Sequence, residues 1–99
     1  MMTTEISKTA QATTVQVAGR LDAATAPLLE NTLCSEIENA QNLILDLKDL
    51  TYISSAGLRV LLSAQKKMQK IGTMTVKNVC HEVMEILEIT GFADILVIE

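Results

Sequence analysis

The chain has 99 residues, of which 48% are apolar and 20% are charged, and its formal net charge is −4. This length and composition predict a single folded domain over residues 1–99 and exclude a disordered chain. The pI of 4.9 argues against a nucleic-acid-binding surface or an anionic-membrane surface. Neither a signal-peptide pattern nor a run of about 18 apolar residues is present, so we expect a cytoplasmic protein with no membrane span.

The first part of the chain is typical of two strands followed by a helix. Alternating apolar residues predict strands at 4–9 and 13–18. Gly19–Asp22 is expected to end the second strand. A helix with Asp22 or Thr25 as its N-terminal cap is then expected to run to about Asn39.

The middle of the chain predicts a strand and a longer helix. Residues 42–47 are almost wholly apolar, as in a buried strand. The helix is expected from Ser55 to Ile71, with Gly72 just beyond its C-terminus. Its buried stripe is expected to contain Leu58, Leu61, Leu62, Gln65 and Met68.

The last part predicts a strand at 73–77, a helix at 79–90 that Gly91 ends, and a final strand at 95–98. The expected order is therefore ββαβαβαβ. Strand–helix–strand units form parallel pairs through right-handed crossovers, whereas the first two strands form an antiparallel pair. This order predicts an α/β fold with a small mixed, mostly parallel sheet and its helices mainly on one face.

Common kinds of catalytic or cofactor site have little support in the residues. His81 is the sole histidine, and the serine segment lacks the G-x-S-x-G pattern of one hydrolase class. Cys34 and Cys80 are far apart, so neither a disulfide framework nor a metal-ligand cluster is expected. The four glycines form no phosphate-binding loop. We therefore expect no enzyme activity, no catalytic residue, no metal and no cofactor.

The segment Tyr52-Ile53-Ser54-Ser55-Ala56-Gly57-Leu58 carries the most information. It places two hydroxyls where a loop after a strand enters a helix, beside unpaired backbone N–H groups that can receive an anion. Ser54 or Ser55 is therefore either a helix cap or a phosphorylation site. Gly57, in the opening turn, suggests a close backbone approach. Asp22 and Asp46 lie in or beside segments expected to converge at this end of the sheet.

The sequence resembles the STAS-domain anti-anti-sigma factors (anti-sigma factor antagonists) of bacteria over essentially its whole length. The motifs that carry the resemblance are Gly19-Arg20-Leu21-Asp22 with Ala26 and Leu29, Leu45-Asp46-Leu47, the serine segment through Leu58, and Leu87-Glu88-Ile89-Thr90-Gly91-Phe92. The resemblance implies a STAS-like fold and a protein that acts by binding other proteins.

The resemblance also implies a phosphorylation switch. In the family, the partner anti-sigma factor is a serine kinase that phosphorylates the serine two positions before the Gly-Leu pair, here Ser55. The unphosphorylated antagonist binds the anti-sigma factor and frees a sigma factor, and a serine phosphatase resets the cycle. Asp22, Ser54, Ala56 and Gly57 are expected to support the switch surface. Many members have Asp where this chain has Ser54, which makes Ser54 a possible second site.

A second hypothesis stays open beside the switch. A STAS module could instead bind a small ligand such as a nucleotide, or act as a scaffold that is never phosphorylated. The lack of glycine loops and the aromatic content of 2% disfavour a nucleotide.

Overall fold

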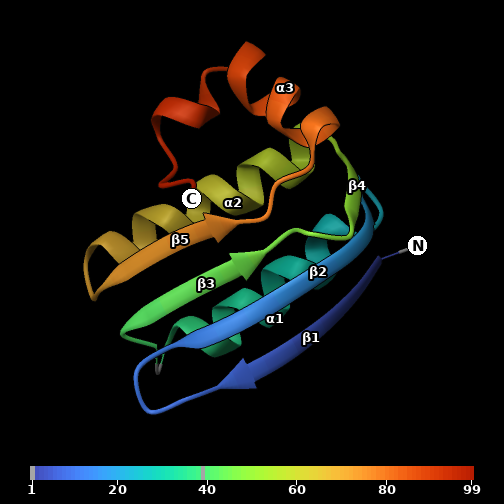
Figure 1. Cartoon of the computed structure of the whole chain (residues 1–99). Helices are drawn as coiled ribbons and strands as arrows, with labels where there is room; N and C mark the ends of the chain where they lie inside the picture. Colours follow the sequence, from blue (N-terminus) through green and yellow to red (C-terminus); the bar gives the residue numbers. More distant parts are fainter. Residues whose placement is uncertain (1, 39) are drawn as a thin grey trace.

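The computed structural model describes residues 2–38 and 40–99. In chain order its elements are β1 (Met2–Lys8), β2 (Thr13–Leu21), α1 (Ala26–Ile37), β3 (Asn42–Asp46), β4 (Leu50–Ile53), α2 (Ser55–Gln69), β5 (Thr73–Lys77), α3 (His81–Ile89) and the 3-10 turn η1 (Phe92–Asp94). The five strands form one sheet (Figure 1). Only the β1–β2 pair is antiparallel among the strands described, which confirms the expected mixed, mostly parallel sheet.

Strand β2 is the centre of the sheet because three strands pair with it. β1 lies along one edge of β2, while β3 and β4 share the other edge, one after the other. The ladder shifts between Gly19 and Arg20, and Gly19 has a φ of 95°. The expected strand end at Gly19–Asp22 is therefore corrected: β2 continues to Leu21, and Gly19 supplies a bulge that a residue with a side chain would adopt poorly.

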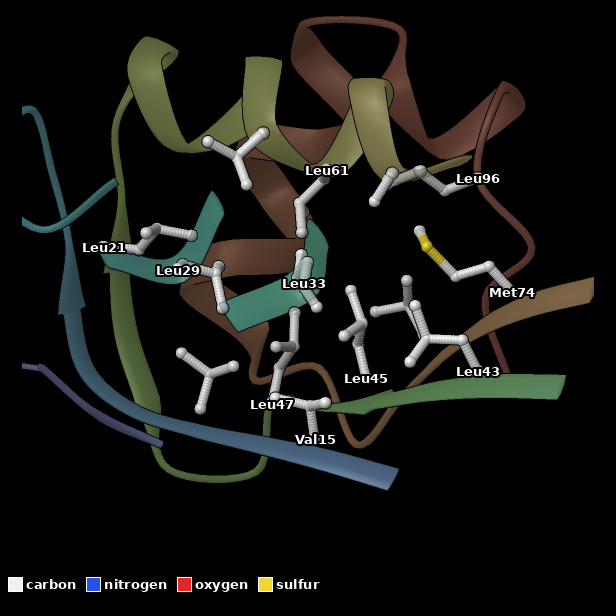
Figure 2. Close-up of a cluster of buried hydrophobic side chains, with 14 of the residues drawn as sticks. Val15, Leu21, Leu29, Leu33, Leu43, Leu45, Leu47, Leu61, Met74 and Leu96 are labelled. Atoms are coloured by element: carbon white, nitrogen blue, oxygen red, sulfur yellow. The ribbon is translucent and has the colours of Figure 1, made fainter. Parts of the chain in front are cut away.

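The hydrophobic core fills one face of the sheet. Alternate strand residues such as Val15 and Leu45 are buried there, because side chains point to opposite faces of a strand in turn. Helices α1 and α2 cover this face (Figure 1). Figure 2 shows Leu29 and Leu33 of α1, and Leu61 of α2, directed towards the strands. The prediction of helices mainly on one face is confirmed.

The observed elements differ from the expected succession in two places. Strand β4 is additional to the expected strands, because the sequence predicts a loop before the helix at these four residues. The expected strand at 95–98 is a single bridge between Val76 and Ile98. Gly91, with a φ of 83°, ends α3 as expected, but it leads the chain into η1, which leaves too few residues for a full strand.

The helix boundaries also need small corrections. Helix α1 ends at Ile37, and the expected end at about Asn39 lies outside the described residues. Gly72 is not in the left-handed conformation of a helix-ending glycine. It is instead a point of close backbone approach, because an added Cβ would overlap the carbonyl oxygen of Gln41. Leu61 is fully buried as expected, whereas Leu62 is only half-buried.

Candidate functional site

The candidate site lies where β2 and β4 end side by side. Leu21 and Ile53 are paired across the two parallel strands. The Ser54 N–H extends this ladder by donating to the carbonyl oxygen of Leu21, at 2.9 Å. The β2–α1 loop, beginning at Asp22, and the first turn of α2 therefore leave the sheet at the same edge. This edge is where the carboxyl ends of parallel strands place functional residues in α/β folds.

The two serines have different structural roles. Ser54 is the N-cap of α2: its backbone is extended, and its Oγ accepts a hydrogen bond from the Gly57 N–H at 3.4 Å. Its carbonyl oxygen accepts the first helical hydrogen bond, from the Leu58 N–H at 2.9 Å. Ser55 is the first residue of α2 and is exposed. The cap and the accessible hydroxyl are thus separate residues, an assignment that spacing alone left open.

Gly57 holds the first turn of α2 against the sheet. A Cβ at this position would lie 2.6 Å from Cγ of Leu21 and 2.9 Å from Cγ1 of Ile53. These distances are too short for any side chain, so the expected close approach is present. Because Gly57 itself is buried, its contribution to the site is to fix the position of the neighbouring half-buried Ala56 and exposed Ser55.

Asp22 organises the loop from β2 to α1. Its Oδ1 accepts hydrogen bonds from the Ala24 N–H at 3.0 Å and the Thr25 N–H at 3.1 Å. The Thr25 N–H is the main reason that the pKa of Asp22 is lowered, since hydrogen bonds to the carboxylate favour its charged form. Thr25 occupies the N-cap position of α1 but makes no side-chain cap bond, and its hydroxyl donates to the Arg20 carbonyl at 2.8 Å.

Asp46 does not join the site, which corrects the expected convergence. It pairs across the sheet with Gln16 of β2, six residues before Asp22. At about 3.3 Å per strand residue, these six residues place about 20 Å of chain between the two positions. The reason is β4, which extends the sheet beyond the end of β3 and carries the serines with it. The Asp46 Oδ1 instead accepts from Asn78 Nδ2 at 3.1 Å.

Sequence reasoning missed two features of the site. The guanidinium of Arg20 lies 4.1 Å from the centre of the Tyr52 ring. A shallow groove also runs between the first turns of α1 and α2, lined by Ala23, Ala26, Pro27, Glu30, Ala56, Arg59 and Val60. Strand alternation could have predicted the contact between Arg20 and Tyr52. Each of them directly precedes a core residue, Leu21 or Ile53, so both side chains point to the opposite face of the sheet. The groove depends on helix packing, which no local pattern reveals.

The residues considered for other chemistry lie outside this site. His81 is exposed in the first turn of α3, and its Nε2 lies 2.8 Å from Glu85 Oε1. Cys34 and Cys80 are free thiols. Within residues 2–38 and 40–99, no cluster of three or more His, Cys, Asp or Glu side chains could hold a metal ion. No helix among those residues is long and apolar enough to cross a membrane.

The family model and the curated relatives indicate one family, and the solved structures share its fold. The STAS domain family model matches residues 3–99. The anti-sigma-B factor antagonist of Bacillus subtilis is 32% identical over 83 residues, which cover 83% of this chain and 76% of that protein. The crystal structure of an anti-sigma factor antagonist from Mycobacterium paratuberculosis superposes with a TM-score of 0.91 at 23% identity, covering 99% of this chain and 85% of that one. SpoIIAA from Bacillus, solved in its phosphorylated form, superposes with a TM-score of 0.76 at 13% identity, covering 98% and 91%.

Proposed function

The chain belongs to the STAS domain family of anti-sigma factor antagonists, and on that basis we propose that it works as a phosphorylation-controlled binding switch. The unphosphorylated form binds an anti-sigma factor that is also a serine kinase, and this binding releases a sigma factor. Phosphorylation of Ser55 ends the binding, and a serine phosphatase restores it. In this scheme residues 1–99 act as one STAS domain in the cytoplasm and catalyse no reaction themselves.

The observation that carries the proposal is that the two serines have different structural roles. Because Ser54 caps α2, Ser55 is left exposed with its hydroxyl at the start of a helix. A phosphate at this position would lie near backbone N–H groups and the positive end of the helix dipole. The fold should therefore tolerate the modification, and the modification should change binding at the surface around Ser55.

Electrostatics explains how the modification would end binding. A phosphoserine adds about −1.5 to −2 charges at neutral pH. If this surface forms the contact with the anti-sigma factor, those charges must lose their water on binding, and acidic groups of the partner repel them. Asp22, fixed by its hydrogen bonds, keeps a negative charge beside the switch in both states. Ser54, Ala56 and Gly57 support the surface by holding the first turn of α2 in place.

The direct test is to capture the anti-sigma factor with the tagged protein, add ATP and map the modified peptide. We expect the phosphate on Ser55, with release of the captured partner. Ser55→Ala should still bind but should not be released by ATP. Ser54→Ala, which loses the cap but keeps the Ser55 hydroxyl, should still be phosphorylated and released by ATP. Phosphate found mainly on Ser54 would refute the assignment of the acceptor.

Ser55→Asp tests the mechanism, although one carboxylate is a partial mimic of phosphate. We expect a native-like circular dichroism spectrum and much weaker binding to the anti-sigma factor. Amide hydrogen exchange of the phosphorylated protein is the stricter measurement. Broad loss of protection in β3 would mean that the switch acts by unfolding, contrary to the proposal. A thermal shift with nucleotides alone, without a partner, would favour the small-ligand alternative instead.

A further inference from the structure

The solvent face of α2 carries positive charge without any acidic neighbour on the same helix. The segment 55–70 contains Arg59, Lys66, Lys67 and Lys70 but no Asp or Glu, in a chain whose net charge is −4. All four cationic residues are exposed. Arg59 is the nearest of them to Ser55, four residues further along, so the two lie one above the other on the helix surface.

The direction of helical side chains brings Arg59 towards Ser55 rather than away from it. Each Cα–Cβ bond of a helix tilts towards the N-terminus, so a long side chain covers the turn that precedes it. For Arg59 that turn begins at Ser55. The ion pairs found among the described residues are Lys8–Glu36, Lys77–Glu99 and His81–Glu85, so Arg59 is in none of them. Arg59 is instead one of the residues that line the groove, together with Glu30 and Ala56.

We propose that Arg59 is the residue within this chain that binds the phosphate on Ser55, and that it leaves the groove to do so. The proposal rests on the proposed function, because it assumes that Ser55 is phosphorylated. A guanidinium presents paired N–H donors that match two phosphate oxygens, and such charge-assisted bonds are among the stronger ones in proteins. Phosphorylation then has two effects at one place: it adds negative charge at Ser55, and it withdraws positive charge from the groove.

The test uses protein in which phosphoserine is inserted at position 55 during translation, so that no kinase is required. The phosphate is titrated by phosphorus NMR in the parent sequence, in Arg59→Gln and in Arg59→Lys. A neighbouring cation favours the dianion, so Arg59→Gln should raise the second pKa of the phosphate. We expect its acid dissociation constant to fall about two- to fivefold, as for a surface ion pair. Arg59→Lys should give an intermediate value, because the charge remains but the paired donors are lost.

Lys66→Gln is the matched control. It removes one positive charge from the same exposed side of the same helix, seven residues and about 10 Å beyond Arg59. Its phosphate should titrate like that of the parent. If Arg59→Gln also titrates like the parent, or if Lys66→Gln shifts the titration equally, Arg59 does not bind the phosphate.

The outcome is independent of the kinase experiment. A kinase that fails to modify Ser55 would refute the proposed function but would leave this titration unchanged. Conversely, a titration that does not depend on Arg59 would refute this inference but would leave the proposed switch at Ser55 intact.

Discussion

Replacing Ser54 by alanine should destabilise the fold, whereas the same change at Ser55 should not. Ser54→Ala removes the acceptor for the Gly57 N–H, and Gly57 is buried against Leu21 and Ile53. Loss of a serine N-cap costs about 0.5–2 kcal/mol. The 3.4 Å bond is longer than most N–H···O bonds, which favours the lower half of that range. The burial of the N–H left without a partner acts in the opposite direction, so we expect about 1 kcal/mol.

Thermal unfolding followed by circular dichroism measures this difference. A loss of about 1 kcal/mol should lower the Tm of a domain this size by roughly 4–8 °C. Ser55→Ala should leave the Tm within about 1–2 °C of the parent, because Ser55 is exposed and surface changes usually stay within about 0.5 kcal/mol. Equal shifts for the two variants, or a larger one for Ser55→Ala, would refute the assignment of Ser54 as the cap.

Three further changes test the packing and the charge of the site. Leu61→Ala, at a fully buried position, should lower the free energy of unfolding by about 2–5 kcal/mol in urea titrations, and Leu62→Ala, at a half-buried one, by clearly less; equal losses would contradict the observed helix phase. Gly57→Ala should lower the free energy of unfolding by about 1–2 kcal/mol, after allowing for the better helix propensity of alanine, because the added methyl group collides with Leu21. A variant more stable than the parent would show that the side chains around Gly57 move aside without cost. The pKa of Asp22 is lower in the folded protein than the ordinary aspartate value of 3.8, so its charge stabilises the fold. This stabilisation is fully present above pH 3.8 and is lost as the pH falls through the pKa of the folded protein. The advantage of the parent over Asp22→Asn in chemical unfolding should therefore shrink from pH 7 to pH 3, and an advantage that stays constant would show that the charge contributes nothing.

Sequence reasoning succeeded where a pattern is local. The alternation of Val15 and Val17 gave β2, and the stripe of Leu58, Leu61 and Met68 gave α2. The helix start at Ser55 is confirmed, although the strand that precedes it is β4 and not the expected strand at 42–47. These features depend on the spacing of apolar side chains and on helix capping, both of which are determined by residues close in the sequence.

The errors in the strands share one physical origin, which is that strand pairing is decided by distant residues. Leu50–Ile53 becomes a strand only because β2 bulges at Gly19 and offers a second stretch of unpaired backbone. The same event moves the serines away from Asp46. The sequence of residues 50–53 alone does not predict pairing with β2, which lies about 30 positions earlier in the chain. At Ile95–Ile98 the opposite error occurs. The apolar run predicts a strand, but it makes one bridge, between Ile98 and Val76.

The central place of β2 has a consequence for synthesis of the chain. Its first partner, β1, is made before it, but the partners of its other edge lie at residues 42–53. A ribosome adding roughly 5–20 residues per second needs about two to six seconds to proceed from Leu21 to Ile53. During that interval the β1–β2 hairpin has an open edge beside Val15 and Val17, of the kind that pairs with foreign strands. The nascent chain should therefore be most prone to aggregation before β3 and β4 emerge.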